Sequence, residues 1–194
     1  MCGRLNVSDA PLSEWVSELL GIRFQAHSNS DLRPTDNVAA VVSLQQPTQL
    51  DLQWGIKPAW AKRLLINAKA ETVAEKITFK AAFAATRCLI PCSGWYEWRI
   101  EGEGHKQKYL FTEPSGLPLL MAAVWYPARG CPDKEGGQFV SLTRPANPAC
   151  LPYHHRMPLF IRPDCVRQWL QGDMATAGTM LGGDDAQSFL ICAA

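Results

Sequence analysis

Residues 87–100 read RCLIPCSGWYEWRI, and this stretch decides the fold. Its two halves, 87–91 and 95–100, both have the pattern of β-strands, and Ser93-Gly94 predicts a turn between them. In the second strand Trp95, Glu97 and Arg99 share one face, because successive side chains of a strand alternate. A fold built mainly from strands is therefore the starting expectation.

Patterns on both sides of this stretch extend the same expectation. Further strands are predicted at 37–44, 49–56, 108–112, 117–125, 138–143 and 188–192. Helices are predicted at 8–21, 74–85 and 163–170, with a short helical turn after Asn147-Pro148. We expect an α+β fold in one domain over residues 2–194, a strand-rich mixed sheet curved into a barrel-like core with a few peripheral helices.

Composition excludes several classes of protein. The chain has 194 residues, 19 Lys+Arg against 18 Asp+Glu, 47% hydrophobic and 19% charged residues, which is typical of a soluble globular protein and not of disorder or coiled coil. No apolar run approaches the roughly 18 residues of a membrane span, and the first residues lack the order of a signal peptide. We expect a cytoplasmic protein and a monomer.

The seven cysteines do not suggest a disulfide framework or a metal site. An odd count without tight spacing is unsuited to paired disulfides, and Cys88 and Cys92 lack a second Cys/His pair at zinc-finger spacing. Most of the thiols are expected to be small core residues. No metal or other cofactor is predicted.

Charge is unevenly distributed along the chain. Residues 54–99 carry eight cationic and three acidic side chains, a local net charge of +5, interleaved with seven aromatic residues. This combination suits single-stranded nucleic acid, whose phosphates attract cations and whose bases stack on rings. A solvated charged face over a tryptophan-rich core explains the same composition.

Cys2 carries distinctive chemistry if Met1 is removed. Its α-amine and thiol then form a 1,2-aminothiol, with unperturbed pKa values near ~8 and ~8.5. With an aldehyde the amine gives an imine, and the thiol closes a five-membered thiazolidine ring in a fast intramolecular step. An early buried cysteine without chemistry is the alternative.

Three other stretches hold candidate polar groups. Glu97 is the only acid among the rings of residues 95–98, where lost solvation raises a carboxyl pKa, although a pairing with Arg99 is an equally simple role. Residues 153–158, YHHRMP, offer a histidine for proton transfer and Arg156 for a phosphate, or simply an exposed loop. Residues 67–72, NAKAET, offer Asn67 and Lys69.

Together, and in this order, these stretches resemble the motifs of the SRAP family (SOS response-associated peptidase, abasic-site processing proteins). The matching segments are MCGR at 1–4, NAKAET at 67–72, CLIPCSGWYEW at 88–98 and HHRMP at 154–158. The resemblance covers the chain from Cys2 to about Pro158, and we expect it to extend to the end. The family's fold is similar to the barrel-like α+β domain expected above.

The resemblance implies a DNA-repair activity of a lyase type. Members bind single-stranded DNA and crosslink the aldehyde of an abasic deoxyribose to an N-terminal cysteine as a thiazolidine. On this chain Cys2 would be the nucleophile, and Asn67 would position the sugar or the Cys2 amine. Glu97 would act as acid and base in ring opening and imine formation, and His154 would assist ring opening and reversal.

The resemblance also implies a DNA-binding set. Arg4, Lys69 and Arg156 match positions that hold phosphates, and Trp54 and Trp60 fall near positions that stack or wedge bases. The peptidase (hydrolase, protease) activity in the family name would here be self-removal of Met1.

Two departures from the family pattern concern this site. Lys69 stands where arginine is common, which makes a phosphate contact less directional. His155 stands where an aspartate often follows the family's histidine, so the orientation or pKa of His154 is affected; the spacing to residues 156–158 favours His154 as the residue that faces the site.

Two further functions are consistent with parts of the sequence. An N-terminal Cys-Gly also begins class II glutamine amidotransferases, which this chain resembles over only the first few residues. A non-covalent single-stranded DNA-binding module would need only the basic, aromatic stretch.

Overall fold

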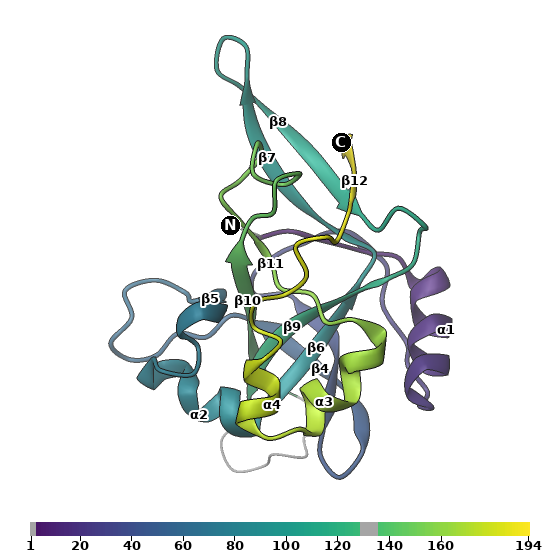
Figure 1. Cartoon of the computed structure of the whole chain (residues 1–194), viewed down its shortest axis with the longest axis vertical. Coiled ribbons are helices and arrows are strands. Elements are labelled where there is room, and N and C mark those ends of the chain that lie inside the picture. The colour runs from purple at the N-terminus through teal and green to yellow at the C-terminus, as the bar shows by residue number, and fades with distance from the viewer. Residues whose placement is uncertain (1–2, 129–135) are drawn as a thin grey trace.

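Two consecutive strands, β6 (Arg87–Cys92) and β7 (Gly94–Glu101), belong to different sheets although only Ser93 separates them. The computed structural model describes residues 3–128 and 136–194 (Figure 1). Both predicted strands are confirmed, but the turn between them does not form a hairpin. It carries the chain from one sheet into the other, and the backbone N–H of Ser93 donates to Asn6 O at 2.9 Å.

Close backbone packing fixes this crossing. A Cβ atom added to Gly94 would lie 2.4 Å from the carbonyl oxygen of Phe111, so no other residue fits there without a backbone shift. The hydroxyl oxygen of Ser93 accepts a hydrogen bond from Ser8 N at 2.9 Å. The turn is therefore anchored to the strand and loop that begin the described chain.

The sheets differ in size and in connectivity. The small sheet has the strand order β12–β8–β7–β1–β2, with β1 (Leu5–Val7), β2 (Asn29–Leu32), β8 (His105–Thr112) and β12 (Leu190–Ala193). The large sheet has the order β11–β10–β4–β3–β6–β9 with β5 beside β10, and comprises β3 (Asn37–Ser43), β4 (Pro47–Trp54), β5 (Asn67–Lys69), β9 (Leu119–Tyr126), β10 (Gln138–Pro145) and β11 (Arg156–Pro158).

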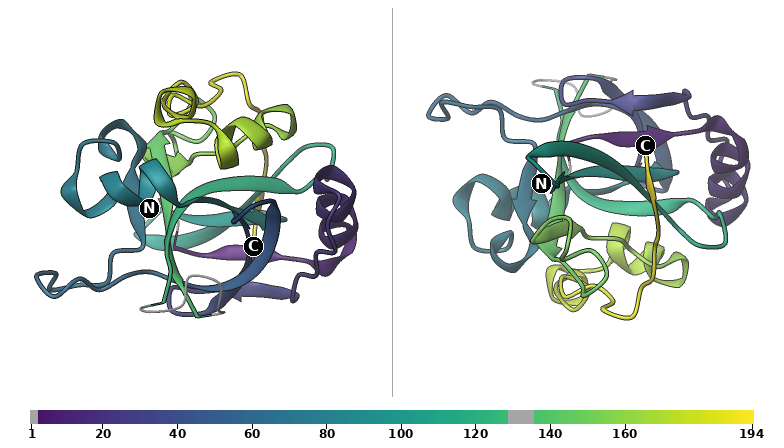
Figure 2. Two further views of the ribbon diagram at one scale, coloured as in Figure 1. Left: turned by 90° about the horizontal axis from the view of Figure 1, so that it is seen from below. Right: turned by 90° about the horizontal axis from the view of Figure 1, so that it is seen from above.

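The large sheet curls back on itself through β10. This strand pairs antiparallel with β9 and β11, and parallel with β5 and, over two residues, with β4. The expected strand-rich, mixed and strongly curved core is confirmed. Its helices lie at the periphery of the curled strands (Figure 2): α1 (Asp9–Leu20), α2 (Ile77–Ala85), α3 (Val166–Gln171) and α4 (Met174–Gly178), with short 3₁₀ turns η1 (Ala70–Thr72) and η2 (Pro163–Cys165).

Local signals predicted most of these elements, with some differences. Helix α1 ends at Gly21, whose φ of 64° is the left-handed conformation that glycine favours. The predicted helical turn after Asn147 is present as a single turn: Leu151 N donates to Asn147 O at 2.9 Å, and the Asn147 side-chain oxygen accepts from Cys150 N at 3.0 Å. Strands β1, β2, β5 and β11 were not predicted because three or four residues show too little alternation.

Arg87 is a buried cation that ties helices to the core. It is 5% exposed, its Nε donates to Trp169 O at 2.6 Å, and its Nη1 donates to Phe83 O at 2.7 Å. One of the eight cations of residues 54–99 is therefore structural. Among the described residues no helix is long and apolar enough to cross a membrane.

Candidate active site

Glu97 points from β7 toward residues 153–160, the segment that begins with the histidine motif. The residues beside it on the same face define this direction: the Trp95 ring lies 5.2 Å from that of Phe160, and the Arg99 guanidinium lies 4.6 Å from the centre of the Tyr153 ring. Glu97 is between them and is only 4% exposed. Its carboxyl group is therefore enclosed between the small sheet and the chain that leads into β11.

Burial changes the acidity of this carboxyl group. Loss of solvation raises the pKa of Glu97 to about 7. Burial, and in second place the charge of Glu97, raises the pKa of the nearby Cys150 thiol to about 12. Glu97 thus titrates near neutral pH, where a carboxyl group both gives and takes a proton readily.

His154 ends the turn that faces Glu97. Its backbone N–H donates to Cys150 O at 3.1 Å, and its Nδ1 lies 2.9 Å from Arg156 N, which donates to it. A neutral ring that accepts at Nδ1 carries its proton on Nε2. Nδ1 also lies 3.1 Å from Arg156 O, which accepts once the ring is charged. The backbone of one residue thus serves both protonation states.

The two adjacent histidines differ in their surroundings. His154 is half-buried, and burial lowers its pKa, whereas His155 is exposed, with ring centres 4.3 Å apart. The structure therefore supports His154 as the inward residue.

Asn67 reaches the same region through β10. It opens β5, which pairs in parallel with β10, and the hydroxyl of Ser141 donates to Asn67 Oδ1. This contact orients the Asn67 amide group, with its oxygen toward Ser141. Lys69, at the other end of β5, is exposed. Its ammonium group is accessible to a ligand.

Arg156 is buried and engaged within the protein, which differs from the prediction. Arg156 is 8% exposed. Its Nη1 donates to one carboxylate oxygen of Glu71, and its Nη2 donates to the other at 2.7 Å. Nη2 also donates to Thr143 O. Glu71 from the 67–72 motif supplies the anion that pairs with Arg156 here, and the phosphate contact of Arg156 stays a prediction.

The two predicted base-stacking tryptophans have opposite environments. Trp54 is fully buried, its ring stacks on Phe139 at 5.9 Å, and its Nε1 donates to Ile66 O at 2.9 Å. The prediction for Trp54 is therefore wrong: a core ring offers no face to a base. Trp60 is 67% exposed, in a loop closed at its base by the Ile56–Leu65 bridge.

The chain that follows Cys2 runs beside Glu97. Leu5 is paired with Trp95 and Asn6 with Gly94, and Tyr96 N donates to Arg4 O at 3.1 Å. Continuing this antiparallel register puts Gly3 opposite Glu97. Cys2 itself lies outside the described residues. Arg4 is partly exposed and pairs with Asp31 at 3.4 Å.

Comparison with known proteins decides the family. Residues 1–188 match the family described as SOS response associated peptidase (SRAP). The chain belongs to the SRAP family. A relative from Escherichia coli K12, named abasic site processing protein YedK, is 28% identical over 183 residues, which are 90% of this chain and 82% of the relative. Abasic site processing protein YoaM of Bacillus subtilis 168 is 25% identical, covering 88% and 79%.

A solved structure shares the fold of this chain. A phage-related protein from Bordetella bronchiseptica superposes with a TM-score of 0.83 at 28% identity, covering 100% of this chain and 94% of that protein. The expected fold class is therefore confirmed by a crystal structure as well as by the strands described above.

The sequence reasoning missed several polar residues of this region. Glu71 was part of a quoted motif but had no assigned role, and Ser141 gave no local signal because its partner is 74 positions away. Asp31, Arg33 and Lys108 form an ion cluster that joins the end of β2 to β8. Within residues 3–128 and 136–194, no group of three or more His, Cys, Asp or Glu side chains is arranged to hold a metal ion.

Proposed function

We propose that this protein processes abasic sites in single-stranded DNA by linking its Cys2 covalently to the damaged sugar. Its membership of the SRAP family and the names of its relatives support abasic-site processing. The finer chemistry follows from Cys2, Glu97 and His154. Hydrolysis of the Met1–Cys2 peptide bond precedes the reaction and liberates the aminothiol, and the protein acts in the cytoplasm.

The proposed crosslink conserves atoms and oxidation states. The Cys2 amine attacks the aldehyde carbon of the ring-opened deoxyribose, and loss of one water gives an imine. The Cys2 sulfur then adds to the imine carbon while the thiol proton goes to the nitrogen. One C–N bond and one C–S bond form, and ring closure is favoured because the thiol and the imine belong to one residue.

The observation that carries this proposal is the position and acidity of Glu97. The register of β1 on β7 aligns Gly3 with a buried carboxyl group whose pKa is about 7. An abasic sugar is mostly a closed hemiacetal, so a proton must reach its ring oxygen before an aldehyde appears. A second proton must reach the hydroxyl that leaves as water. Glu97 is suited to both transfers.

His154 and Asn67 are the other two residues of the proposed catalytic site, and each has its own role. The backbone of Arg156 accepts or donates at His154 Nδ1 according to the charge of the ring, so this histidine can change protonation without turning. Asn67, oriented by Ser141, offers an uncharged amide for the sugar or the amine. These residues assist ring opening and later reversal.

Intact-mass spectrometry tests the proposal in one measurement. The wild-type protein is mixed with a single-stranded oligonucleotide that bears one abasic site. We expect loss of Met1 and a protein–DNA species equal to the sum of the two masses minus one water. Cys2→Ala should give no stable species, and Glu97→Gln and His154→Ala should slow its formation.

Cys192→Ala is the matched control. Cys192 is an exposed free cysteine on β12, so its removal tests whether any accessible thiol suffices. It should leave the yield unchanged. A stable adduct of equal yield from Cys2→Ala would contradict the proposal, as would a wild-type protein that binds the damaged strand and never adds its mass.

A further inference from the structure

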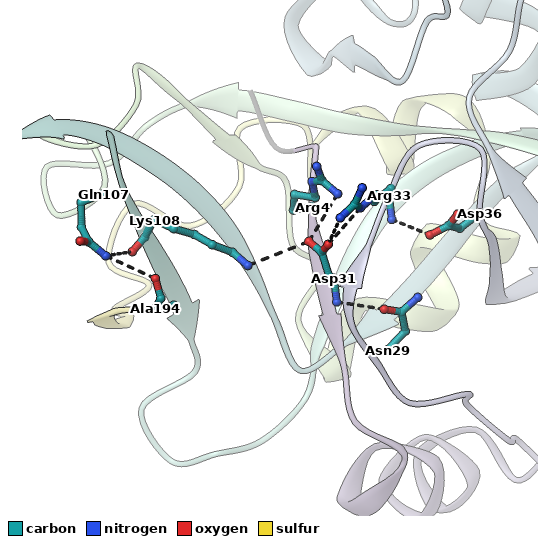
Figure 3. A network of polar contacts seen from close by, with 8 residues as sticks. All are labelled: Arg4, Asn29, Asp31, Arg33, Asp36, Gln107, Lys108 and Ala194. Atoms are coloured by element: carbon teal, nitrogen blue, oxygen red, sulfur yellow. Dashed lines mark hydrogen bonds and ion pairs between the residues drawn. The ribbon is translucent and has the colours of Figure 1, made fainter. Parts of the chain in front are cut away.

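Three cationic side chains, one just before β1, one just after β2 and one on β8, converge on one carboxylate in the small sheet (Figure 3). Arg4 Nη1 lies 3.4 Å and Lys108 Nζ 4.0 Å from the same oxygen of Asp31, Oδ1. Arg33 Nε donates to the other oxygen, Oδ2, at 2.9 Å. We call these four residues the Asp31 cluster. It holds three positive charges and one negative charge.

The cluster lies on the face of the small sheet opposite to Glu97. Lys108 pairs with Trp98, and Arg4 is bonded to Tyr96, so both cations belong to the face that alternates with Glu97. Lys108 Nζ lies 3.8 Å from the centre of the Tyr96 ring. One of the three positive charges therefore lies over an aromatic ring.

Two nearby acids have contacts other than with these three cationic side chains. Glu101 alternates onto the Glu97 face, where it pairs with Arg99 at 2.5 Å. The Asp36 carboxylate accepts from the backbone N–H of Arg33 at 2.8 Å. The four side chains of the cluster are not buried, since they are between 26% and 59% exposed. Exposed pairs of this kind contribute little to stability, so a role in stability alone does not account for the cluster.

The backbone beneath the cluster is held in place. Ala194 N donates to Lys108 O at 2.9 Å, as the end of the chain packs along β8, and the side chain of Gln107 donates to the same carbonyl at 2.8 Å (Figure 3). On the other side, Asp31 N donates to the Asn29 side chain at 2.9 Å. The charged groups thus project from fixed strands.

The cluster is also close to the reactive end of the chain. Two residues span at most about 7 Å, so covalent geometry alone keeps the Cα atom of Cys2 within that distance of the Cα atom of Arg4. A DNA strand whose sugar reaches Cys2 would extend past Arg4. Its phosphates are the anions that match three converging cations.

We propose that the Asp31 cluster is a phosphate-binding surface for the DNA strand beside the trapped sugar, with Arg33 and Lys108 as its contacts beyond Arg4 and Asp31 as the residue that positions all three. This proposal rests on the proposed function for its ligand. Asp31 both orients the cations and competes with phosphate for them, so its charge limits affinity.

Affinity for undamaged single-stranded DNA, measured at several salt concentrations, tests the surface. Lys108→Gln and Arg33→Gln should each weaken binding several-fold and reduce the slope of log K against log salt by about 0.7, the value for one phosphate of a single strand. Asp31→Asn keeps the shape of the side chain and removes its charge. It should tighten binding.

Arg162→Gln is the matched control, since it also removes one exposed cation, paired with Asp164 at 2.7 Å outside the cluster. It should leave affinity and slope as in the wild type, and thermal unfolding checks that every variant is folded. Equal effects of Arg162→Gln and Lys108→Gln would overturn the proposal. So would weaker binding by Asp31→Asn, because the cluster would then serve only to hold its own strands together.

A second readout separates this proposal from the proposed function. Crosslink yield on abasic DNA is measured at protein concentrations that saturate each variant. A normal yield with weakened affinity in Lys108→Gln and Arg33→Gln supports the surface. A normal wild-type crosslink with unchanged affinities in both variants overturns the surface and leaves the proposed function standing. If the wild type gives no crosslink, the proposed function fails, and the affinity data decide the surface by themselves.

Discussion

Both carboxylate oxygens of Glu71 accept hydrogen bonds from the guanidinium group of Arg156, which lies 85 positions away in the sequence. The pair joins the 67–72 motif to the 154–158 motif, and Arg156 in turn holds the ring of His154 through its backbone. Two motifs that look independent in the sequence are thus one structural unit. The pair therefore holds the segment that carries His154 against the 67–72 segment.

Removing Glu71 should destabilise the protein more than removing its partner. Glu71→Ala leaves a buried guanidinium without its anion, a change that costs about 3 kcal/mol in buried pairs. Arg156→Met leaves Glu71, 44% exposed, in contact with water, and should cost less. Urea unfolding measures both. A larger loss for Arg156→Met would show that packing, not charge, dominates at this site.

The same pair should make stability depend on pH. The Arg156 guanidinium lowers the pKa of Glu71 below its usual value. Its contribution is therefore fully present above the ordinary glutamate pKa of about 4.3 and is lost as the pH falls toward the lower folded value. Glu71→Gln should flatten this acid limb of the free energy of unfolding. The exposed Glu75, replaced by Gln, should leave it unchanged.

The sequence predicted elements well and their assembly less well. Residues 87–100 gave both strands and the turn correctly, because alternation and a Gly-containing turn are local signals. That the turn changes sheets depends on the approach of Gly94 to the Phe111 carbonyl, a contact between residues 17 positions apart. No local pattern encodes such a contact, and the same holds for the curl of β10 onto β9.

Ionisation of the buried Glu97 should lower the free energy of unfolding as the pH rises. Its folded pKa of about 7 exceeds the unfolded value of about 4.3, so the native state binds more protons between these values and stability falls with pH across that window. Glu97→Gln mimics the protonated group and should gain stability over the wild type, by at most about 4 kcal/mol above pH 7. Urea unfolding at pH 5 and pH 8 measures the difference. An equal effect at both values would mean that Glu97 is not protonated near neutral pH.

His154 should titrate below the ordinary histidine range. Burial lowers its pKa, so the neutral ring persists to lower pH than the ordinary histidine pKa of about 6.5 allows. NMR of the ring protons, assigned with His154→Gln, should show a midpoint below that value. Stability from this group is present above the unfolded pKa and is lost as the pH falls through the folded one. A midpoint above 6.5 would exclude the neutral ring with its proton on Nε2 as the resting state at mildly acidic pH.

Residue type alone did not distinguish site residues from structural ones. Glu97 was identified correctly as a carboxyl group with a raised pKa because its aromatic neighbours are adjacent in sequence. Arg156, Arg87 and Trp54 also had the right chemistry, but their partners are distant in sequence and their burial is visible only in the fold. Cationic and aromatic residues are suited to DNA and to the core alike, and only tertiary contacts decide between them.

Trp54 and Trp60 provide a direct test of this distinction. Trp54→Phe removes part of a fully buried ring and its bond to Ile66 O, and should cost about 2 kcal/mol in the free energy of unfolding. Trp60→Ala alters an exposed loop and should change stability by less than about 0.5 kcal/mol. It should instead weaken binding of single-stranded DNA by about 1–3 kcal/mol, the range for one stacked base. Urea unfolding and fluorescence anisotropy measure the two quantities. If Trp60→Ala leaves affinity unchanged, or if the DNA affinity of folded Trp54→Phe falls by as much, the assignment of Trp60 to the DNA and Trp54 to the core is wrong.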